Sequence, residues 1–231
     1  TSRARIQKFF WPDQSDSAVP LWLVSEAGLP AFLTQLSAAQ AAWLGNQGFQ
    51  AEKGRVVTIP DERGAVAAAV AGLGLAPGNA PANLWDAAPL PERLPAGRYR
   101  LGSALAGNVA TQFALGWLLG SYRYTRFRSQ PKAAATTSLV LPEGADGAYA
   151  EAAAAAMFGA RDLINAPANE LGPEQLAQVA AELAQEFGGH SRLYAGDELR
   201  EQYPLVHAVG AGSARPPRLI DCRWPRAGAR R

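Results

Sequence analysis

Few residues in this chain are of types that could carry chemistry. The 231-residue sequence contains two histidines, His190 and His207, and a single cysteine, Cys222. It has no His-Glu-x-x-His and no Cys-x-x-Cys segment, so the usual spacings of zinc ligands are absent. We expect His190 to be solvent-exposed beside glycines at a helix exit, and His207 to be a structural residue within a strand. Cys222 lies in an apolar segment with Leu219 and Ile220, which predicts a buried thiol that resists forming the reactive thiolate.

The glycine and serine motifs of common enzymes are also incomplete. Residues 210–215, Gly-Ala-Gly-Ser-Ala-Arg, lack the final glycine of a dinucleotide-binding fingerprint and the Gly-Lys-Ser/Thr of a phosphate-binding loop. Ser213 is not flanked as in Gly-x-Ser-x-Gly, which argues against a nucleophile elbow. Four carboxylates of the second half have no spacing that would converge them on one site: Asp162, Glu170, Asp197 and Asp221. From the residues alone we assign no catalytic, cofactor-binding or metal-binding residue.

Composition narrows the class of protein. A hydrophobic content of 48% with 18% charged residues is typical of a globular chain with one large domain or two small ones. The net charge of +2 gives no strong reason to expect nucleic-acid or membrane binding. A single cysteine excludes an internal disulfide and fits a reducing, cytoplasmic setting. No apolar run approaches the ~18 residues of a membrane span.

Strands and helices alternate in the first half of the chain. Ser37 and Gln40 fit a capping box at the start of a helix. Residues 65–75 are ambiguous, because their alanines favour a helix whereas Val66, Ala68 and Val70 alternate as in a strand. The irregular, proline-rich segment 77–95 allows at most one helical turn, near residues 84–85. Short apolar or β-branched runs predict strands at 19–24, 55–59, 98–101 and 136–141.

A longer helix follows the third of these strands. Val109, Phe113, Trp117 and Tyr124 share one helical face, and Gly116 and Gly120 on that face predict close packing of another element against the helix backbone. A basic tract then begins. It is compatible with an anion or nucleic-acid contact and with a solvated helix end favoured by the helix dipole, of which we favour the second. The tract consists of Arg123, Arg126, Arg128 and Lys132.

The turn-rich segment 142–147 predicts a domain boundary, with domains at 1–145 and 146–231. An alanine-rich helix should run from about Ala148 to Ala166, where the following proline disfavours the helical conformation. Pro173 suits the first position of the next helix, which glycines at 188 and 189 should end. The remainder predicts strands at 193–194, 205–209 and 219–224, a short helix at 197–202 and a loop at 210–217.

Three ordered segments resemble the leucyl (cytosol) aminopeptidase family. They are Leu118 to Phe127 (Leu-Leu-Gly-Ser-Tyr-Arg-Tyr-Thr-Arg-Phe), Arg161 to Pro173 (Arg-Asp-Leu-Ile-Asn-Ala-Pro-Ala-Asn-Glu-Leu-Gly-Pro) and His207 to Asp221 (His-Ala-Val-Gly-Ala-Gly-Ser-Ala-Arg-Pro-Pro-Arg-Leu-Ile-Asp). The resemblance implies an α/β fold class: a mixed α/β N-terminal domain followed by the opening helices and strands of an α/β zinc-exopeptidase-like catalytic domain. It also favours a strand at 65–75.

The same resemblance implies a metal-dependent release of N-terminal residues, leucine preferred, from peptides by a cytoplasmic protein that commonly forms hexamers. Family members use two divalent metal ions, manganese or zinc, held by a lysine and several carboxylates that follow the strand matching 219–224. This chain instead continues with Trp224-Pro-Arg-Ala-Gly-Ala-Arg-Arg231. We therefore expect a truncated chain that binds no metal and is inactive alone. Two alternatives remain: a non-enzymatic interaction or nucleic-acid-binding module, and a non-functional truncated gene product.

Overall fold

The computed structural model describes residues 6, 9–11, 17–75, 82–127 and 136–225. The chain forms two compact units, Thr1–Arg161 and Asp162–Arg231, called unit 1 and unit 2. The domain boundary predicted at 145/146 stays a prediction. The two compact units are defined by contacts within the chain and not by domain ancestry. None of the described helices is both long and apolar enough to cross a membrane.

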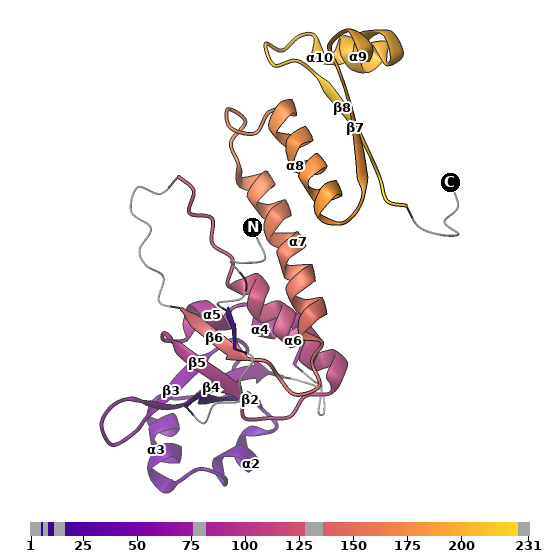
Figure 1. Ribbon diagram of the computed structural model, residues 1–231. Helices are drawn as coiled ribbons and strands as arrows, with labels where there is room; N and C mark the ends of the chain where they lie inside the picture. Colours follow the sequence, from indigo (N-terminus) through magenta and orange to yellow (C-terminus); the bar gives the residue numbers. More distant parts are fainter. Residues whose placement is uncertain (1–5, 7–8, 12–16, 76–81, 128–135, 226–231) are drawn as a thin grey trace. The chain divides into compact units, whose positions relative to one another are not determined.

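Unit 1 is built on a six-stranded sheet in the order β1-β6-β5-β2-β4-β3 (Figure 1). Every neighbouring pair is parallel except β3 with β4. Each of the strands predicted in the first half is present, and unit 1 has the mixed α/β fold that was expected. The strands are β1 (Phe10–Trp11), β2 (Val19–Ser25), β3 (Val56–Pro60), β4 (Val66–Gly74), β5 (Gly97–Leu101) and β6 (Thr137–Val140).

Strand β4 resolves the ambiguity of the alanine-rich segment. It pairs with β2 on one edge and β3 on the other, so its backbone groups are satisfied within the sheet. Ala68 and Val70 face one apolar core, whereas Ala69 and Ala71 face a second core on the opposite side. A strand buried on both faces reads as a continuous apolar run, which is why its composition resembled that of a helix.

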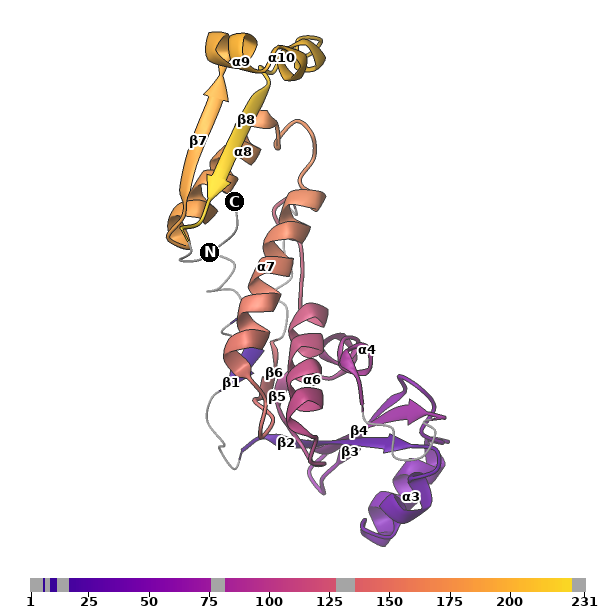
Figure 2. The ribbon, with the colours of Figure 1, turned by 90° about the vertical axis from the view of Figure 1, so that its right-hand side faces the viewer.

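Helices cover both faces of this sheet (Figures 1 and 2). One face carries α2 and α3, and the other carries α4, α6 and the first part of α7. The capping box is confirmed, since the Ser37 hydroxyl accepts from the Gln40 amide and the Gln40 side chain accepts from the Ser37 amide. Helices α2 and α5 were not predicted: the segment 77–95, in which at most one helical turn was expected, contains both α4 and α5. The helices of this unit are α2 (Leu29–Leu33), α3 (Ala38–Asn46), α4 (Leu84–Ala87), α5 (Leu90–Arg93), α6 (Gly107–Gly120) and α7 (Gly147–Asn165), the last of which ends in unit 2.

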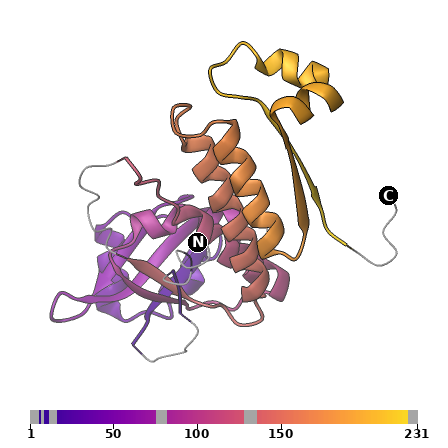
Figure 3. The same cartoon turned by 45° about the horizontal axis from the view of Figure 1, so that its top comes forward.

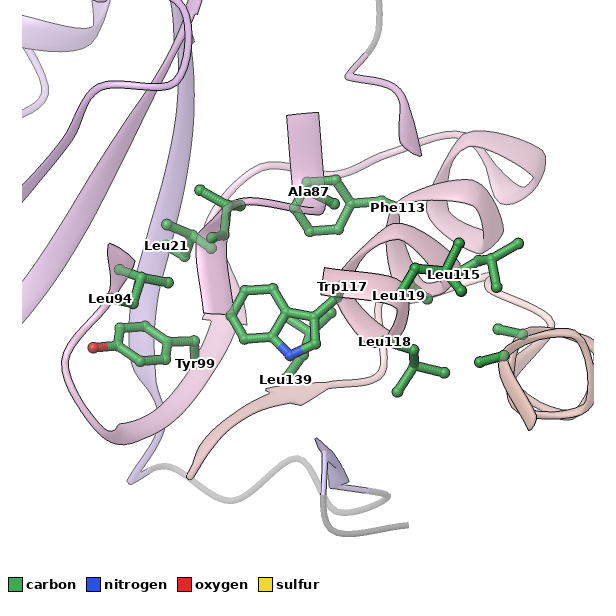
Figure 4. Close-up of a cluster of buried hydrophobic side chains, with 14 of the residues drawn as sticks. Leu21, Ala87, Leu94, Tyr99, Phe113, Leu115, Trp117, Leu118, Leu119 and Leu139 are labelled. Atoms are coloured by element: carbon green, nitrogen blue, oxygen red, sulfur yellow. The ribbon is translucent and has the colours of Figure 1, made fainter. Parts of the chain in front are cut away.

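Helix α6 is the centre of the larger core. Trp117 is fully buried beside Tyr99 of β5 and Leu139 of β6, and Phe113, also fully buried, lies beside Ala87 (Figure 4). The predicted close approach to its glycines is confirmed. A Cβ atom on Gly116 would lie 2.1 Å from the Leu84 carbonyl oxygen, so α4 packs directly on the α6 backbone.

Unit 2 is a helix packed along a two-stranded antiparallel sheet (Figure 3). The segment that leads into this helix is residues 166–172, which we call the elbow. As predicted, α7 ends at Asn165 and Pro173 is the first residue of the next helix. The elements are α8 (Pro173–Glu186), β7 (His190–Ala195), α9 (Gly196–Gln202), α10 (Pro204–Gly210) and β8 (Arg218–Arg223).

Two sequence predictions in unit 2 are wrong. Residues 205–209 form most of α10 and not a strand, because Pro204 occupies the first position of a helix, where its fixed φ is favourable and its missing N–H is not needed. His207 is accordingly a helical residue. Cys222 is only partly buried, since its strand belongs to a two-stranded sheet and its thiol lies 3.8 Å from the Ala180 carbonyl of α8.

Candidate functional site

A cleft of about 630 Å³ lies where the carboxyl ends of β5 and β6 meet the start of α6. Its walls are the segment from Arg100 to Leu105, the segment from Val140 to Gly144, and Gly107. The carboxyl ends of parallel strands are the usual place for ligand sites in α/β proteins. The cleft is therefore the first place in unit 1 to inspect for chemistry.

The groups in this cleft do not form a catalytic arrangement. Ser103 lines the cleft, and none of the lining residues is a histidine. Arg100 is exposed and its Nε donates to the Ala18 carbonyl at 3.4 Å, and Glu143 is also exposed. A serine without a general base beside it is a poor nucleophile, so the cleft has the location of a ligand site without the residues of an enzyme centre.

In unit 2 the predicted polar residues lie apart and pair with arginines. Asp221 accepts from Arg223 at 2.8 Å, and this hydrogen bond raises the pKa of the arginine. Asp197 pairs with Arg200 at 2.9 Å across one helical turn. Each carboxylate thus serves a local ion pair. Asp162 belongs to the end of α7, and Glu170 belongs to the elbow.

The histidines and cysteine are equally dispersed. His190 begins β7 and is exposed, as predicted, whereas His207 is half-buried in α10. Among the residues that the structure describes, no three His, Cys, Asp or Glu side chains come close enough to hold a metal ion. The donor set of these residues therefore does not fit a two-metal centre, which needs several ligands around ions about 3.5–4 Å apart.

An aromatic and basic cluster organises the far end of unit 2. The rings of Tyr194 and Tyr203 meet edge to face at 5.0 Å, and the Arg192 guanidinium lies 4.5 Å from the Tyr194 ring centre. Arg192 also pairs with Glu198 at 2.8 Å. A hydrogen bond with Tyr194 raises the pKa of Tyr203. The cluster joins β7 to the α9–α10 corner and is a packing element.

Two arginines that the sequence did not single out hold the beginning of unit 2 together. Arg215 donates from its guanidinium to the carbonyl oxygens of Ala168 and Asn169, the second at 2.6 Å. Arg218 donates to Glu174, in the first turn of α8, at 2.9 Å. Both arginines lie in the family-like segment from His207 to Asp221, but an arginine in a polar loop carries no sequence signal for such a contact.

The basic tract after α6 is a helix end where the structure describes it. Arg123 donates to the carbonyls of Gly120 and Tyr122 and lies 3.6 Å from Glu92. A cation at this position satisfies carbonyls that have no partner within the helix. Arg128 and Lys132 lie outside the described residues. The interpretation as a solvated helix end is therefore the one that the described contacts favour.

Both halves of the chain match domains of one class of metallopeptidase. The N-terminal domain model of M17 aminopeptidases matches residues 19–142, and the catalytic domain model of the cytosol aminopeptidase family matches residues 158–231. The fold is also that of solved aminopeptidases. Cytosol aminopeptidase from Coxiella burnetii superposes with a TM-score of 0.84 at 26% identity, over 95% of this chain and 47% of that one. The chain belongs to the M17 aminopeptidase family.

Individual relatives cover parts of the chain. A probable cytosol aminopeptidase from Brucella anthropi is 35% identical over 135 residues, which are 53% of this chain and 27% of the relative. Peptidase B from Cronobacter sakazakii is 53% identical over 64 residues, which are 26% of this chain and 15% of the relative. The bottromycin maturation enzyme BotP in complex with Mn has a TM-score of 0.68 at 30% identity, over 91% of this chain and 46% of that one. The chain thus spans about half the length of the solved structures that it matches.

Proposed function

We propose that this chain is part of a leucyl aminopeptidase that removes N-terminal residues from peptides. In this proposal residues 1–145 are its N-terminal domain and residues 146–231 open its catalytic domain. The observation that carries the proposal is the pair of family matches, in order, over residues 19–142 and 158–231. Relatives named cytosol aminopeptidase and peptidase B support the same activity.

The proposed cofactors are two divalent metal ions, manganese or zinc, and the proposed assembly is a hexamer in the cytoplasm. Support for a metal comes from the related enzyme BotP, which is described in complex with Mn. The described residues of this chain offer no fitting donor set. We therefore assign none of them to a metal and derive no catalytic step from them. The part that they would contribute is the scaffold that leads into the site.

The alternatives drawn from the sequence are not favoured. A nucleic-acid-binding role rested on the basic tract, in which Arg123 contacts helix-end carbonyls and Glu92, and Arg126 lies over the Phe127 ring. A non-functional gene product is not favoured, because both family models match the chain in order over residues 19–142 and 158–231. The family matches favour the aminopeptidase over both alternatives.

The test is an activity assay on the purified 231-residue chain. Leucine p-nitroanilide is incubated with the chain and manganese or zinc, beside a longer chain that includes any coding sequence following residue 231. The cytosol aminopeptidase of Coxiella burnetii serves as the positive control. We expect metal-dependent turnover from the longer chain and none from the 231 residues. Turnover that co-elutes with the short chain would overturn the assignment of its residues as scaffold, and an inactive, metal-loaded longer chain would overturn the proposed activity.

A further inference from the structure

The elbow is held in part by hydrogen bonds from a distant segment of the chain. Its internal backbone bonds converge on one acceptor, since Glu170 and Leu171 both donate to the Pro167 carbonyl, at 2.9 and 3.0 Å. The next two carbonyls, of Ala168 and Asn169, point to a segment more than 40 residues later in the chain, where both accept from Arg215. The conformation of the elbow is therefore tied to the loop that precedes β8.

We propose that Arg215 is a latch: its guanidinium fixes the elbow, and its release frees the elbow without unfolding the rest of unit 2. The planar guanidinium presents several donors in a rigid fork, so one side chain can serve two consecutive carbonyls. A lysine ammonium carries a single centre of charge and cannot span both in the same way. The latch rests on these contacts alone and does not depend on the proposed aminopeptidase activity.

Gly172 supplies an independent sign that the elbow is fitted to this arginine. Its φ of −103° and ψ of −175° are accessible to any residue, so the backbone does not demand glycine there. A Cβ atom at this position would instead lie 2.9 Å from Nη1 and 3.1 Å from Cδ of Arg215. The glycine therefore makes room for the arginine side chain.

The loop that carries Arg215 is itself braced. The Arg215 amide donates to the Ser213 hydroxyl at 3.1 Å, and Pro217 packs so closely on Gly210 that a Cβ there would lie 2.3 Å from the proline ring. Three residues after the latch, Arg218 pairs with Glu174 in the first turn of α8. This second contact links α8 to β8 without involving Arg215, so we expect the loss of Arg215 to act locally.

Hydrogen exchange on the full 231-residue chain tests the proposal. The reporters are the Glu170 and Leu171 amides, and the amides of α8 and β7 serve as an internal check of folding. We expect Arg215→Ala to raise exchange at the reporters about tenfold, the effect of losing two charge-assisted bonds near the surface. Arg215→Lys should raise it about threefold, because one of two bonds is retained. The matched control is Arg200→Ala, which removes an exposed ion pair of the same unit and should leave the reporters unchanged.

A double-mutant comparison separates a latch from a general loss of stability. Gly172→Ala displaces Arg215 and should raise reporter exchange in the natural chain, but should add little once Arg215→Ala is present, since the two changes break the same contact. Reporter exchange in Arg215→Ala equal to that of the natural chain would overturn the latch. So would additive effects of the two substitutions, or an equal loss of protection throughout α8 and β7.

Discussion

The packing of α4 on α6 makes a sharp prediction about Gly120. A Cβ atom built there would lie 1.7 Å from the Ala88 carbonyl oxygen and 3.0 Å from its Cα atom. These are backbone atoms of Ala88, at the end of α4, and the Ala88 amide already donates to the Leu84 carbonyl. No side-chain rotation can therefore relieve the clash. Gly120→Ala must therefore push two helices apart beside the buried Trp117.

Two opposing magnitudes decide the sign. Alanine in place of glycine inside a helix is favourable by about 0.8–1.0 kcal/mol. Overpacking a filled core is unfavourable by about 1–3 kcal/mol, and by more where backbone must move. Because the overlap here exceeds an ångström against backbone, we expect a net destabilisation of at least about 2 kcal/mol, or a fall in Tm of roughly 4–8 °C for a chain of this size.

The assay is urea unfolding followed by tryptophan fluorescence, which reports mainly unit 1 because five of the six tryptophans lie there. Gly45→Ala in α3 is the matched control. A Cβ at that helical position meets nothing within 4 Å, so the substitution should stabilise by about 0.5–1 kcal/mol. A Gly120→Ala chain at least as stable as the natural one would refute the reasoning, because propensity would then outweigh the apparent overlap.

Three further predictions concern single positions. Burial raises the pKa of Tyr99, so the stability from its neutral phenol is complete below about pH 10 and is lost as pH rises through the raised native pKa. Tyr99→Phe also loses the hydrogen bond to the Pro95 carbonyl, so it should destabilise the chain by about 1–2 kcal/mol at pH 7 and abolish the alkaline loss of stability in urea titrations. Ala51 is fully buried at φ 61°, so Ala51→Val should lower stability by at least about 2 kcal/mol, while Ala51→Gly should change it by less than about 1 kcal/mol in the same assay. Pro173→Ala should be mild, whereas Leu183→Pro in mid-α8 should destabilise unit 2 by about 3 kcal/mol or more; equal thermal shifts would contradict the helix bounds.

Most elements of unit 1 could be predicted because each depends on a pattern of residues that lie close together in the sequence. The Ser37 capping box and the helical face of Gly116 and Gly120 both depend on residues a few positions apart, and both are confirmed. The segment 65–75 could not be decided in this way. Its conformation depends on β2 and β3, which bury its two faces, and pairing between distant strands is not visible in a short window.

The errors in unit 2 have a related cause. Residues of the types found at Leu205, Val206 and Val209 favour a strand. The sequence therefore predicted a strand there, although the preceding proline favours the start of a helix. In the structure Leu205 and Val209 remain 81% and 88% exposed, so no sheet rewards their β preference and the helix start at Pro204 prevails. Cys222 was placed correctly in a strand, but its burial required cover that a two-stranded sheet gives on one face only.

The contacts that hold the elbow could not be predicted from the sequence. Arg215 and Arg218 reach back 47 and 44 positions, to carbonyls of the elbow and to Glu174. A guanidinium in a polar loop has the same local signature whether it is solvated or clamps a backbone segment, so only the fold distinguishes the two. Resemblance found the segments that contain both arginines, yet it did not reveal that the segments touch. The physical reason for keeping Arg215 and Gly172 together emerges only when the side chain is seen lying in the space that a Cβ atom would fill.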